Sequence, residues 1–331
     1  MASGDNKRNL AELLRAGGYD EEGNVPYSSN LAETSKEVQR RVRALKKFQL
    51  ESITLESEFY KRVHELEKEF QPMFDAINVK RKAVVTGEHE PTDAECDVPL
   101  VHGLGEEELQ KLEKEAPVEG TPSKGIPEFW YNALNNTSQL GEMMHEYDVP
   151  ILKYLNDITT EVHSEPTGFT LLFHFSENPY FTNTVLKKYY ELQITPDNDD
   201  PYNYDGPTVI KCRGTEINWK EGKNVTQKVV KKKQKKGSGA GKFITKTVSN
   251  ESFFNFFDAE EKTLTEDMDE TLQESLREDF EVGQIIRDQI IPRAVLFFTG
   301  EGIEEDDFDF DDHGEDADED SEGDDDEEEE E

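Results

Sequence analysis

The stretch that decides the fold is residues 34–77, which read TSKEVQRRVRALKKFQLESITLESEFYKRVHELEKEFQPMFDAI. Apolar side chains recur along it at steps of three or four residues, and the pattern is broken only where Ser52 fills the seam. This spacing is typical of one face of an α-helix, sustained here far beyond the ordinary helix length. The apolar positions are Val38, Val42, Leu45, Phe48, Leu55, Phe59, Val63, Leu66, Phe70, Met73 and Ile77.

A helix of this length cannot bury its apolar stripe inside one small domain. Thr34 or Ser35 can cap its first turn, and about 45 residues at 1.5 Å each reach roughly 65–70 Å. We expect Pro72 to bend or break the helix near its end. The same helix of a second chain would cover the stripe, so we expect a homodimer; the alternative is a long helix packed on its own domain. The expected dimerisation residues are Val38, Val42, Leu45, Phe48, Leu55, Phe59, Val63, Leu66 and Phe70.

Residues 126–302 follow a different pattern, typical of a mixed domain. A short helix opens near Phe129, an amphipathic stretch covers 137–163, and a second amphipathic helix is expected at 270–291. Strands are expected at 169–175, 185–194 and 208–213, and a hairpin joins 225–230 to 242–248. Strands that follow one another without long helical crossovers favour an antiparallel sheet with helices over one face. The fold class is therefore α+β: a long N-terminal dimerisation helix, then this domain, then an acidic disordered tail.

Composition divides the chain further. It carries 75 Asp and Glu against 37 Lys and Arg, a formal net charge of −38. Residues 301–331 hold 22 of the acids and no Lys or Arg, which leaves −16 on residues 1–300. A body and tail of this sign repel nucleic acids and anionic membranes and attract polycations. We expect a disordered N-terminal arm at 1–30, the long helix at 31–85, an accessory insertion at 86–125 with a helix near 106–114, the domain at 126–302 and the tail at 303–331.

Signals for membranes, disulfides and enzymes are weak. The N-terminus has no apolar signal region, no run of about 18 apolar residues occurs, and Cys96 and Cys212 are expected to be free thiols. The glycine-rich 237–242 is one residue short of a phosphate loop, and Phe243 follows where Ser or Thr is needed. The histidines lack zinc-ligand spacing. We expect an intracellular protein that is not an enzyme and has no metal or cofactor.

A cluster of lysines stands out in this acidic chain. It lies at the tip of the expected hairpin, which spans 225–248, and its core is Lys231, Lys232, Lys233, Lys235 and Lys236. We favour a nuclear import signal that an import receptor would bind. A nucleic-acid contact and a solvated turn are the alternatives, and base stacking is disfavoured because no aromatic residue interleaves the lysines.

The tail contains more than charge. A solubilising tail has no use for exposed aromatic side chains, yet Phe308 and Phe310 lie among acids. An aromatic anchor with flanking carboxylates is typical of a segment that binds a basic protein. The flanking acids are Glu304, Glu305, Asp306, Asp307, Asp309, Asp311 and Asp312. A second candidate is the acidic loop of Asp197, Asp199, Asp200 and Asp205.

Five strings of the chain resemble nucleosome assembly protein 1. They are GIPEFW at 125–130, NPYFTN at 178–183, INWK at 217–220, ESFFNFF at 251–257 and PRAVLFFTGE at 292–301, and the order and spacing match across about residues 30–310. The resemblance implies a dimeric histone chaperone that shuttles between nucleus and cytoplasm, and the nucleosome assembly protein fold. It also implies that tail glutamates can be glutamylated, with Glu327, Glu328, Glu329, Glu330 and Glu331 as candidates. The C-terminal prenylation cysteine of some relatives is absent, so membrane anchoring is not expected.

The function that we expect is binding of core histones, with linker histone as a further candidate. The acidic surfaces would compete with DNA for basic histone surfaces, prevent nonspecific histone–DNA aggregates and promote nucleosome assembly and disassembly without ATP. The alternative is an acidic coiled-coil adaptor without histone specificity, and a cofactor or phosphatase inhibitor of the related acidic SET type is a third.

Overall fold

A computed structural model describes residues 34–115, 124–233, 243–265 and 268–303. The expected N-terminal arm, the acidic segment 304–312, the glutamylation candidates and Lys235 and Lys236 all lie outside these residues. None of the helices in the described ranges is both long and apolar enough to cross a membrane.

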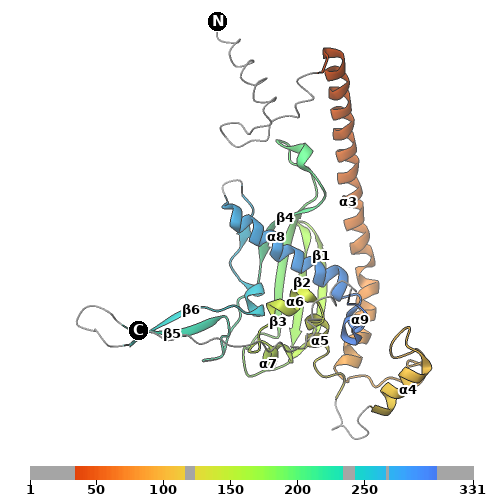
Figure 1. The fold of residues 1–331 in the computed structure, drawn as a ribbon, viewed down its shortest axis with the longest axis vertical. Helices are drawn as coiled ribbons and strands as arrows, with labels where there is room; N and C mark the ends of the chain where they lie inside the picture. The colour runs from red at the N-terminus through yellow and green to blue at the C-terminus, as the bar shows by residue number, and fades with distance from the viewer. Residues whose placement is uncertain (1–33, 116–123, 234–242, 266–267, 304–331) are drawn as a thin grey trace, which may run out of the picture.

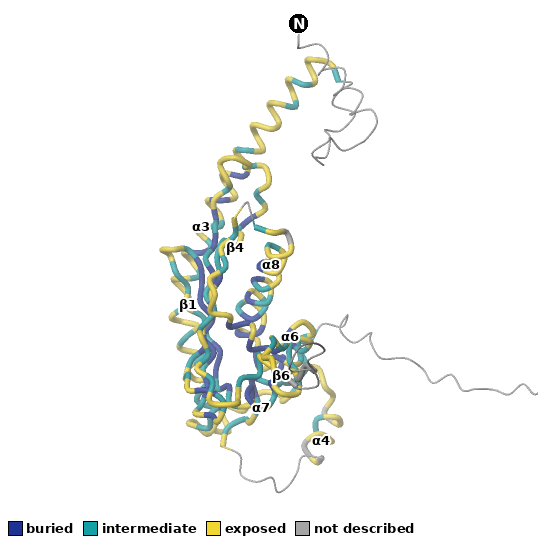
Figure 2. Tube along the Cα trace, turned by 90° about the vertical axis from the view of Figure 1, so that its left-hand side faces the viewer, coloured by how far each residue is buried: buried dark blue, intermediate teal, exposed yellow. Residues whose placement is uncertain are grey.

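Helix α3 (Lys36–Val85) is the predicted long helix, and it runs for 50 residues. Ser35 caps it, because its side chain accepts a hydrogen bond from the Val38 backbone N–H at 3.4 Å. We expected Pro72 to bend or break the helix, and it does not break it, since α3 continues to Val85. Pro72 lacks the N–H that would bond to the Lys68 carbonyl, and both residues are exposed. The first turns of α3 stand clear of the rest of the described chain (Figure 2), and from Lys46 on the helix contacts the domain.

The domain is built on a five-stranded antiparallel sheet in the order β1-β2-β3-β4-β7. Its strands are β1 (Leu155–Ser164), β2 (Thr167–Phe175), β3 (Val185–Gln193), β4 (Thr208–Arg213) and β7 (Lys262–Thr263). The antiparallel sheet and the strands β2, β3 and β4 confirm the prediction. The second half of the amphipathic stretch 137–163 is strand β1, where β-branched residues such as Ile158 and Val162 favour extended backbone.

Helices cover one face of this sheet (Figure 1). They are α5 (Phe129–Asn135), α6 (Ser138–Met143), α7 (Val149–Leu152), α8 (Glu270–Gln284), the π-helical turn η3 (Ile285–Ile290) and α9 (Ala294–Thr299). The 3₁₀ turn η2 (Phe253–Phe257) inserts four buried phenylalanines between helices and strands. Phe173 of β2 meets this plug, with its ring centroid 4.9 Å from that of Phe257. The aromatic core therefore fixes the helical layer to the sheet.

Three smaller elements lie at the margins of the domain. The accessory segment carries α4 (Glu106–Glu115), as expected. Strands β5 (Gln227–Lys233) and β6 (Phe243–Ser249) form the predicted hairpin as a separate two-stranded sheet that projects from the body (Figure 1). The 3₁₀ turn η1 (Pro201–Asn203) lies in the connection from β3 to β4.

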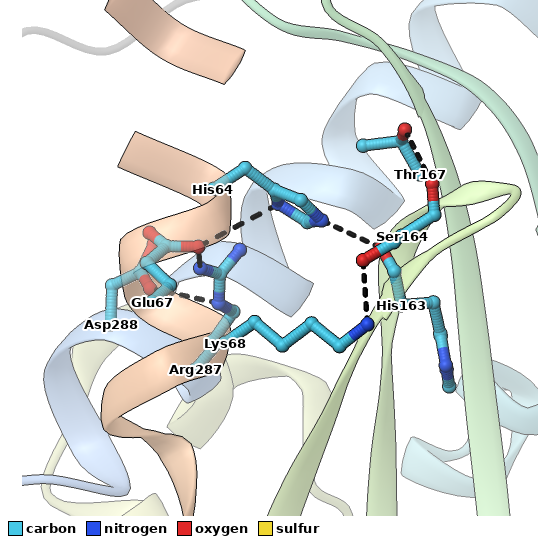
Figure 3. A network of polar contacts seen from close by, with 8 residues as sticks. All are labelled: His64, Glu67, Lys68, His163, Ser164, Thr167, Arg287 and Asp288. Atoms are coloured by element: carbon cyan, nitrogen blue, oxygen red, sulfur yellow. Dashed lines mark hydrogen bonds and ion pairs between the residues drawn. The ribbon is translucent and has the colours of Figure 1, made fainter. Parts of the chain in front are cut away.

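The C-terminal half of α3 docks along strand β1. The His64 ring Nε2 lies 2.6 Å from the His163 carbonyl oxygen, and Lys68 donates to the Ser164 hydroxyl at 2.7 Å (Figure 3). Glu67, next to His64 on the helix, pairs with Arg287 of η3 (Figure 3). These polar contacts tie the long helix to both the sheet and the helical layer.

Candidate functional site

The outer face of α8 is acidic. Glu274, Glu278 and Glu281 are all exposed, and at 100° per residue their positions fall within about 60° of one another. The inner face carries the buried Leu276 and Phe280, which enter the core. We call Glu274, Glu278 and Glu281 the acidic stripe. Because like charges gather on one exposed helix face, the stripe attracts a cationic surface.

The inner face of α8 also explains why the stripe points outward. Tyr190 of β3 is fully buried and donates to the Asp279 carboxylate at 2.8 Å. Gly283 makes room for this contact, since a Cβ there would lie 2.5 Å from a Tyr190 ring carbon. Burial, aided by the Asp279 charge, raises the pKa of Tyr190 well above its usual value, so the phenol keeps the proton that it donates.

A polar groove of about 510 Å³ begins at the end of the stripe. One wall belongs to α8 and η3, and the other belongs to the connection between α5 and α6. Amide and carboxylate groups in such a groove can hydrogen-bond a protein main chain and pair with Lys or Arg. The lining residues are Asn136, Thr137, Ser138, Gln139, Glu281, Gln284, Ile285, Asp288, Gln289, Phe297 and Gly302.

One acid of the groove has an altered pKa. Burial raises the pKa of Asp288, although the neighbouring Arg287 guanidinium, 3.3 Å away, opposes the shift. A cation that enters the groove would favour the charged form and pull this pKa down again. Asp288 can therefore respond to a bound lysine or arginine.

The acidic tail starts at the same groove. Helix α9 ends at Gly300, which adopts a left-handed conformation with φ of 86°, and Gly302 lies in the groove wall. The Glu301 carboxylate accepts a hydrogen bond from the His102 backbone N–H at 2.7 Å and another from the Thr299 hydroxyl. These bonds lower the pKa of Glu301. Residues 300–303, the last described part of the chain, therefore lie at the groove.

The predicted acidic loop lies elsewhere. Asp197, Asp199, Asp200 and Asp205 are exposed, as expected, but they belong to the connection between β3 and β4. That connection leaves the end of the sheet opposite α5 and α7 (Figure 1). The structure does not bring this loop together with the acidic stripe.

Contacts with α3 hold the loop in place. Ser57 of α3 donates to the Ile194 carbonyl at 3.1 Å, and Tyr202 donates to the Lys46 carbonyl at 3.3 Å. The Lys46 ammonium also lies 4.7 Å from the centre of the Tyr202 ring. The loop is thus part of the α3 side of the molecule.

The apolar residues of α3 that we expect to form the dimerisation seam are mostly exposed to solvent in the single chain. Leu45, Phe48, Leu55 and Phe59 are between 59 and 72 % exposed. Val38, Leu66 and Phe70 are exposed as well, whereas Val42 and Val63 are half-buried. Two further apolar residues of α3, Phe74 and Val79, were not among the predicted dimerisation residues, and they are 57 and 66 % exposed. Surfaces of this kind on one helix are typical of protein interfaces.

The acidic stripe and Asp288 are the candidate residues that sequence reasoning missed. The sequence contains a pattern that could have predicted the stripe. Within the expected helix 270–291, acids recur at steps of four and three residues, at Glu274, Glu278 and Glu281. The groove had no such signal, because residues 136–139 and 297–302 join it only through the fold. Of the import-signal lysines, Lys231, Lys232 and Lys233 lie on β5.

No arrangement for metal binding accompanies these surfaces. Across residues 34–115, 124–233, 243–265 and 268–303, no group of three or more His, Cys, Asp or Glu side chains is placed to hold a metal ion. Cys212 is buried, which raises the pKa of its thiol to about 11, so it is a poor nucleophile at neutral pH. What the described surfaces offer is recognition of a basic protein.

Known proteins are similar to this chain in sequence and in fold. The family model described as "Nucleosome assembly protein (NAP)" matches residues 40–301. Human nucleosome assembly protein 1-like 4 is 45 % identical over 302 residues, which cover 86 % of this chain and 80 % of the human protein. Nucleosome assembly protein 1-like 1-A of Xenopus laevis is 43 % identical and covers 83 % of this chain and 72 % of its own length. Among solved structures, nucleosome assembly protein 1 from Plasmodium knowlesi superimposes with a TM-score of 0.50 at 28 % identity, over 81 % of this chain and 99 % of that one.

Proposed function

The chain belongs to the nucleosome assembly protein family, and on that premise we propose that it is a histone chaperone that acts without catalysis. The observation that carries the proposal is the acidic surface beside the last described residues of the chain. Gly302 lines the same groove as Glu281 and Asp288, and the acidic sequence 304–331 follows directly along the chain. Histones are polycations, and this arrangement can hold one between them.

The energetics require many contacts. An exposed ion pair contributes only about 0–1 kcal/mol, so no single carboxylate can capture a histone. The stripe, Asp288 and the tail acids together supply many weak pairs, and Phe308 and Phe310 supply apolar anchors. Such a chaperone lowers the concentration of free histone below the level at which nonspecific histone–DNA aggregates form. It releases histone to DNA by differential binding, and no ATP is needed.

Dimerisation through α3 belongs to the same proposal. The exposed apolar residues of α3 extend from Val38 to Val79 and remain uncovered, although the helix also contacts its own domain from Lys46 to Arg81. A second copy of the helix would cover them. Two copies of the acidic stripe would then act on one histone cargo.

Further parts of the proposal come from the family and the sequence. Core histones are the proposed cargo, and linker histone is a further candidate. An import receptor would read the lysine-rich hairpin, so that the protein shuttles between cytoplasm and nucleus. Glutamylation of Glu327–Glu331 would add charge to the tail.

A histone–DNA aggregation assay tests the function. Core histones are added to DNA at physiological salt with increasing amounts of the full chain, and turbidity and supercoiling are measured without ATP. We expect turbidity to fall and nucleosomal supercoils to form. An acidic adaptor without histone specificity would leave the aggregates in place, and that result would exclude the proposed function.

A further inference from the structure

The face of the sheet that looks away from α8 carries a row of four side chains, one from each of four neighbouring strands. The register pairs Glu161 with Thr170, Thr170 with Tyr189 and Tyr189 with Arg213. Residues directly opposite one another in antiparallel strands share a face. The next residue of β3, Tyr190, points the other way and packs on Phe280 of α8. The row therefore lies on the face opposite the acidic stripe.

A shallow cavity, which we call the hollow, lies over this row. Its volume is about 380 Å³, and all of its lining residues belong to the strands β1 to β4 and the segments next to them. In the neighbouring row, β2 places Gly168 between His163 and Glu191, and His163 lines the hollow as well. The lining residues are Glu161, His163, Glu165, Pro166, Thr170, Lys187, Tyr189, Arg213, Gly214 and Thr215.

The floor of the hollow is fixed by its own contacts. Thr170 is buried, and its hydroxyl lies 2.8 Å from Nε2 of His163. The His163 ring in turn lies 6.0 Å from the Tyr189 ring, tilted against it. A rigid floor of one hydroxyl and two rings can support a ligand backbone and the stem of a long side chain.

The two ends of the hollow have opposite charge. Glu161 and Glu165 lie at the β1 end, and Arg213 and Lys187 lie on β4 and β3. All four are exposed. Within the described parts of the chain, Glu161, Lys187 and Arg213 make no ion pair with another residue. By contrast, Lys211 in the neighbouring row is already engaged, since its ammonium lies 3.5 Å from Glu191 and 3.6 Å from Glu261.

From this arrangement we infer that the hollow is a second binding site, for an extended peptide that carries one cationic and one anionic side chain. Strands lie about 4.8 Å apart, so three steps separate Glu161 from Arg213 by roughly 14 Å. An extended peptide advances about 3.3 Å per residue, so its two charges would be about four residues apart. The cation pairs with Glu161 and Glu165, and the anion, a carboxylate or a phosphate, pairs with Arg213 and Lys187.

The site goes beyond the proposed histone function and does not rest on it. Its residues lie across the sheet from the stripe and the groove, and its ligand carries an anion as well as a cation, whereas the acidic surfaces select cations. A failure of the histone assay would leave this inference untouched, and a failure of this inference would leave the histone proposal untouched.

The test uses the full chain and labelled nine-residue peptides in fluorescence anisotropy. Each peptide has one Arg and one anionic residue separated by two, four or six positions, and the anion is Asp in one series and phosphoserine in the other. We expect the tightest binding at a separation of about four. The two series decide between carboxylate and phosphate as the preferred anion. A peptide with Arg alone measures nonspecific attraction to the acidic parts of the chain.

Matched variants locate the site. Glu161→Gln and Arg213→Gln each remove one exposed ion pair and should weaken binding about three- to fivefold. Glu221→Gln and Lys228→Gln remove the same charges at exposed positions outside the hollow, and they should leave affinity unchanged. Binding that ignores the charge separation, or that survives both Glu161→Gln and Arg213→Gln, would overturn the inference. Equal binding of the Arg-only peptide would overturn it as well.

Discussion

The Nζ atom of Lys188 on β3 lies 2.6 Å from Oδ2 of Asp279 on α8, and the lysine is 1 % exposed. The same ammonium donates to the Phe256 carbonyl of the aromatic plug at 2.8 Å. One buried cation thus joins the sheet, the plug and α8. The contact fixes the rotation of α8 about its axis, so that Glu274, Glu278 and Glu281 face outward.

The first prediction concerns stability. Asp279→Ala leaves Lys188 buried without a counter-charge, which should lower the free energy of unfolding by about 3–5 kcal/mol in urea denaturation. The double variant Lys188→Met/Asp279→Leu should recover much of this loss, because it removes the unpaired charge. Glu278→Ala, one residue away on the exposed side, is the control and should change stability by less than about 0.5 kcal/mol. A loss below about 1 kcal/mol for Asp279→Ala would contradict this role.

A second buried pair predicts a pH dependence. Asp157 of β1 is 3 % exposed, and burial raises its pKa to about 6, although Arg81 of α3 lies 3.6 Å away and opposes the shift. The carboxyl of Asp157 has a pKa near 3.8 in the unfolded chain and about 6 in the folded chain. At a pH between these two values, the folded chain therefore binds more protons than the unfolded chain. The free energy of unfolding should therefore fall as pH rises from about 4 to 6, and this contribution should level off above.

Asp157→Asn removes this titration. Between pH 4 and pH 7, the free energy of unfolding of the parent chain should fall by up to about 3 kcal/mol relative to that of the variant. This follows because a shift of one pKa unit corresponds to about 1.4 kcal/mol. The comparison cancels groups that both proteins share, among them Asp288 and His174, whose pKa values are also shifted. Unfolding curves for the two proteins that run parallel across this range would show that Asp157 is not responsible.

The third prediction concerns the seam. Leu45→Asp combined with Leu66→Asp should convert the proposed dimer into monomers by light scattering, because both side chains are exposed in the single chain and a partner helix would bury them. The domain should keep its helical and strand content, since neither residue belongs to the core. Lys47→Asp, on the same helix, is the control. A dimer that survives both aspartates would rule out the seam.

The fourth prediction separates apolar anchors from charge in the tail. Phe308→Ser with Phe310→Ser keeps every carboxylate, yet it removes two side chains that can each contribute about 1.5–3 kcal/mol when buried in a complex. Histone affinity should fall about tenfold or more. Asp309→Asn, which removes one charge between them, should have a much smaller effect. Unchanged affinity in the double serine variant would mean that the tail acts by charge alone.

Local patterns predicted most of the fold. The period of α3, the strands β2 to β4, the hairpin and the plug of Phe253–Phe257 all follow from the spacing of apolar residues. Strand β1 was missed because Ile151, Leu152, Leu155 and Ile158 keep a helical spacing across the boundary between α7 and β1. Pairing with β2 decides the conformation there, and no local window contains that information.

The candidate surfaces were less predictable. The acidic stripe is visible as a spacing of acids within one helix, whereas the groove joins residues 136–139, 281–289 and 297–302 through tertiary packing. The opposed charges of Glu161 and Arg213 depend on the register of four strands. A one-residue slip would move each strand's side chains to the other face, so sequence spacing alone cannot place them together.

We propose that the acidic face of α8 beside Gly302, rather than acidity in general, binds the histone. Two variants of the full chain test it with equal changes of charge. One is Glu274→Gln/Glu278→Gln/Glu281→Gln in the stripe, and the other is Asp197→Asn/Asp199→Asn/Asp200→Asn in the loop between β3 and β4. All six side chains are exposed, so both variants should fold like the parent chain.

The measurement is the affinity of each variant for core histone dimers and tetramers across a salt titration. We predict that the stripe variant binds about tenfold more weakly, from three exposed pairs at about 0.5 kcal/mol each, and that the loop variant stays within about threefold of the parent chain. Equal losses in the two variants, or a larger loss in the loop variant, would contradict the account.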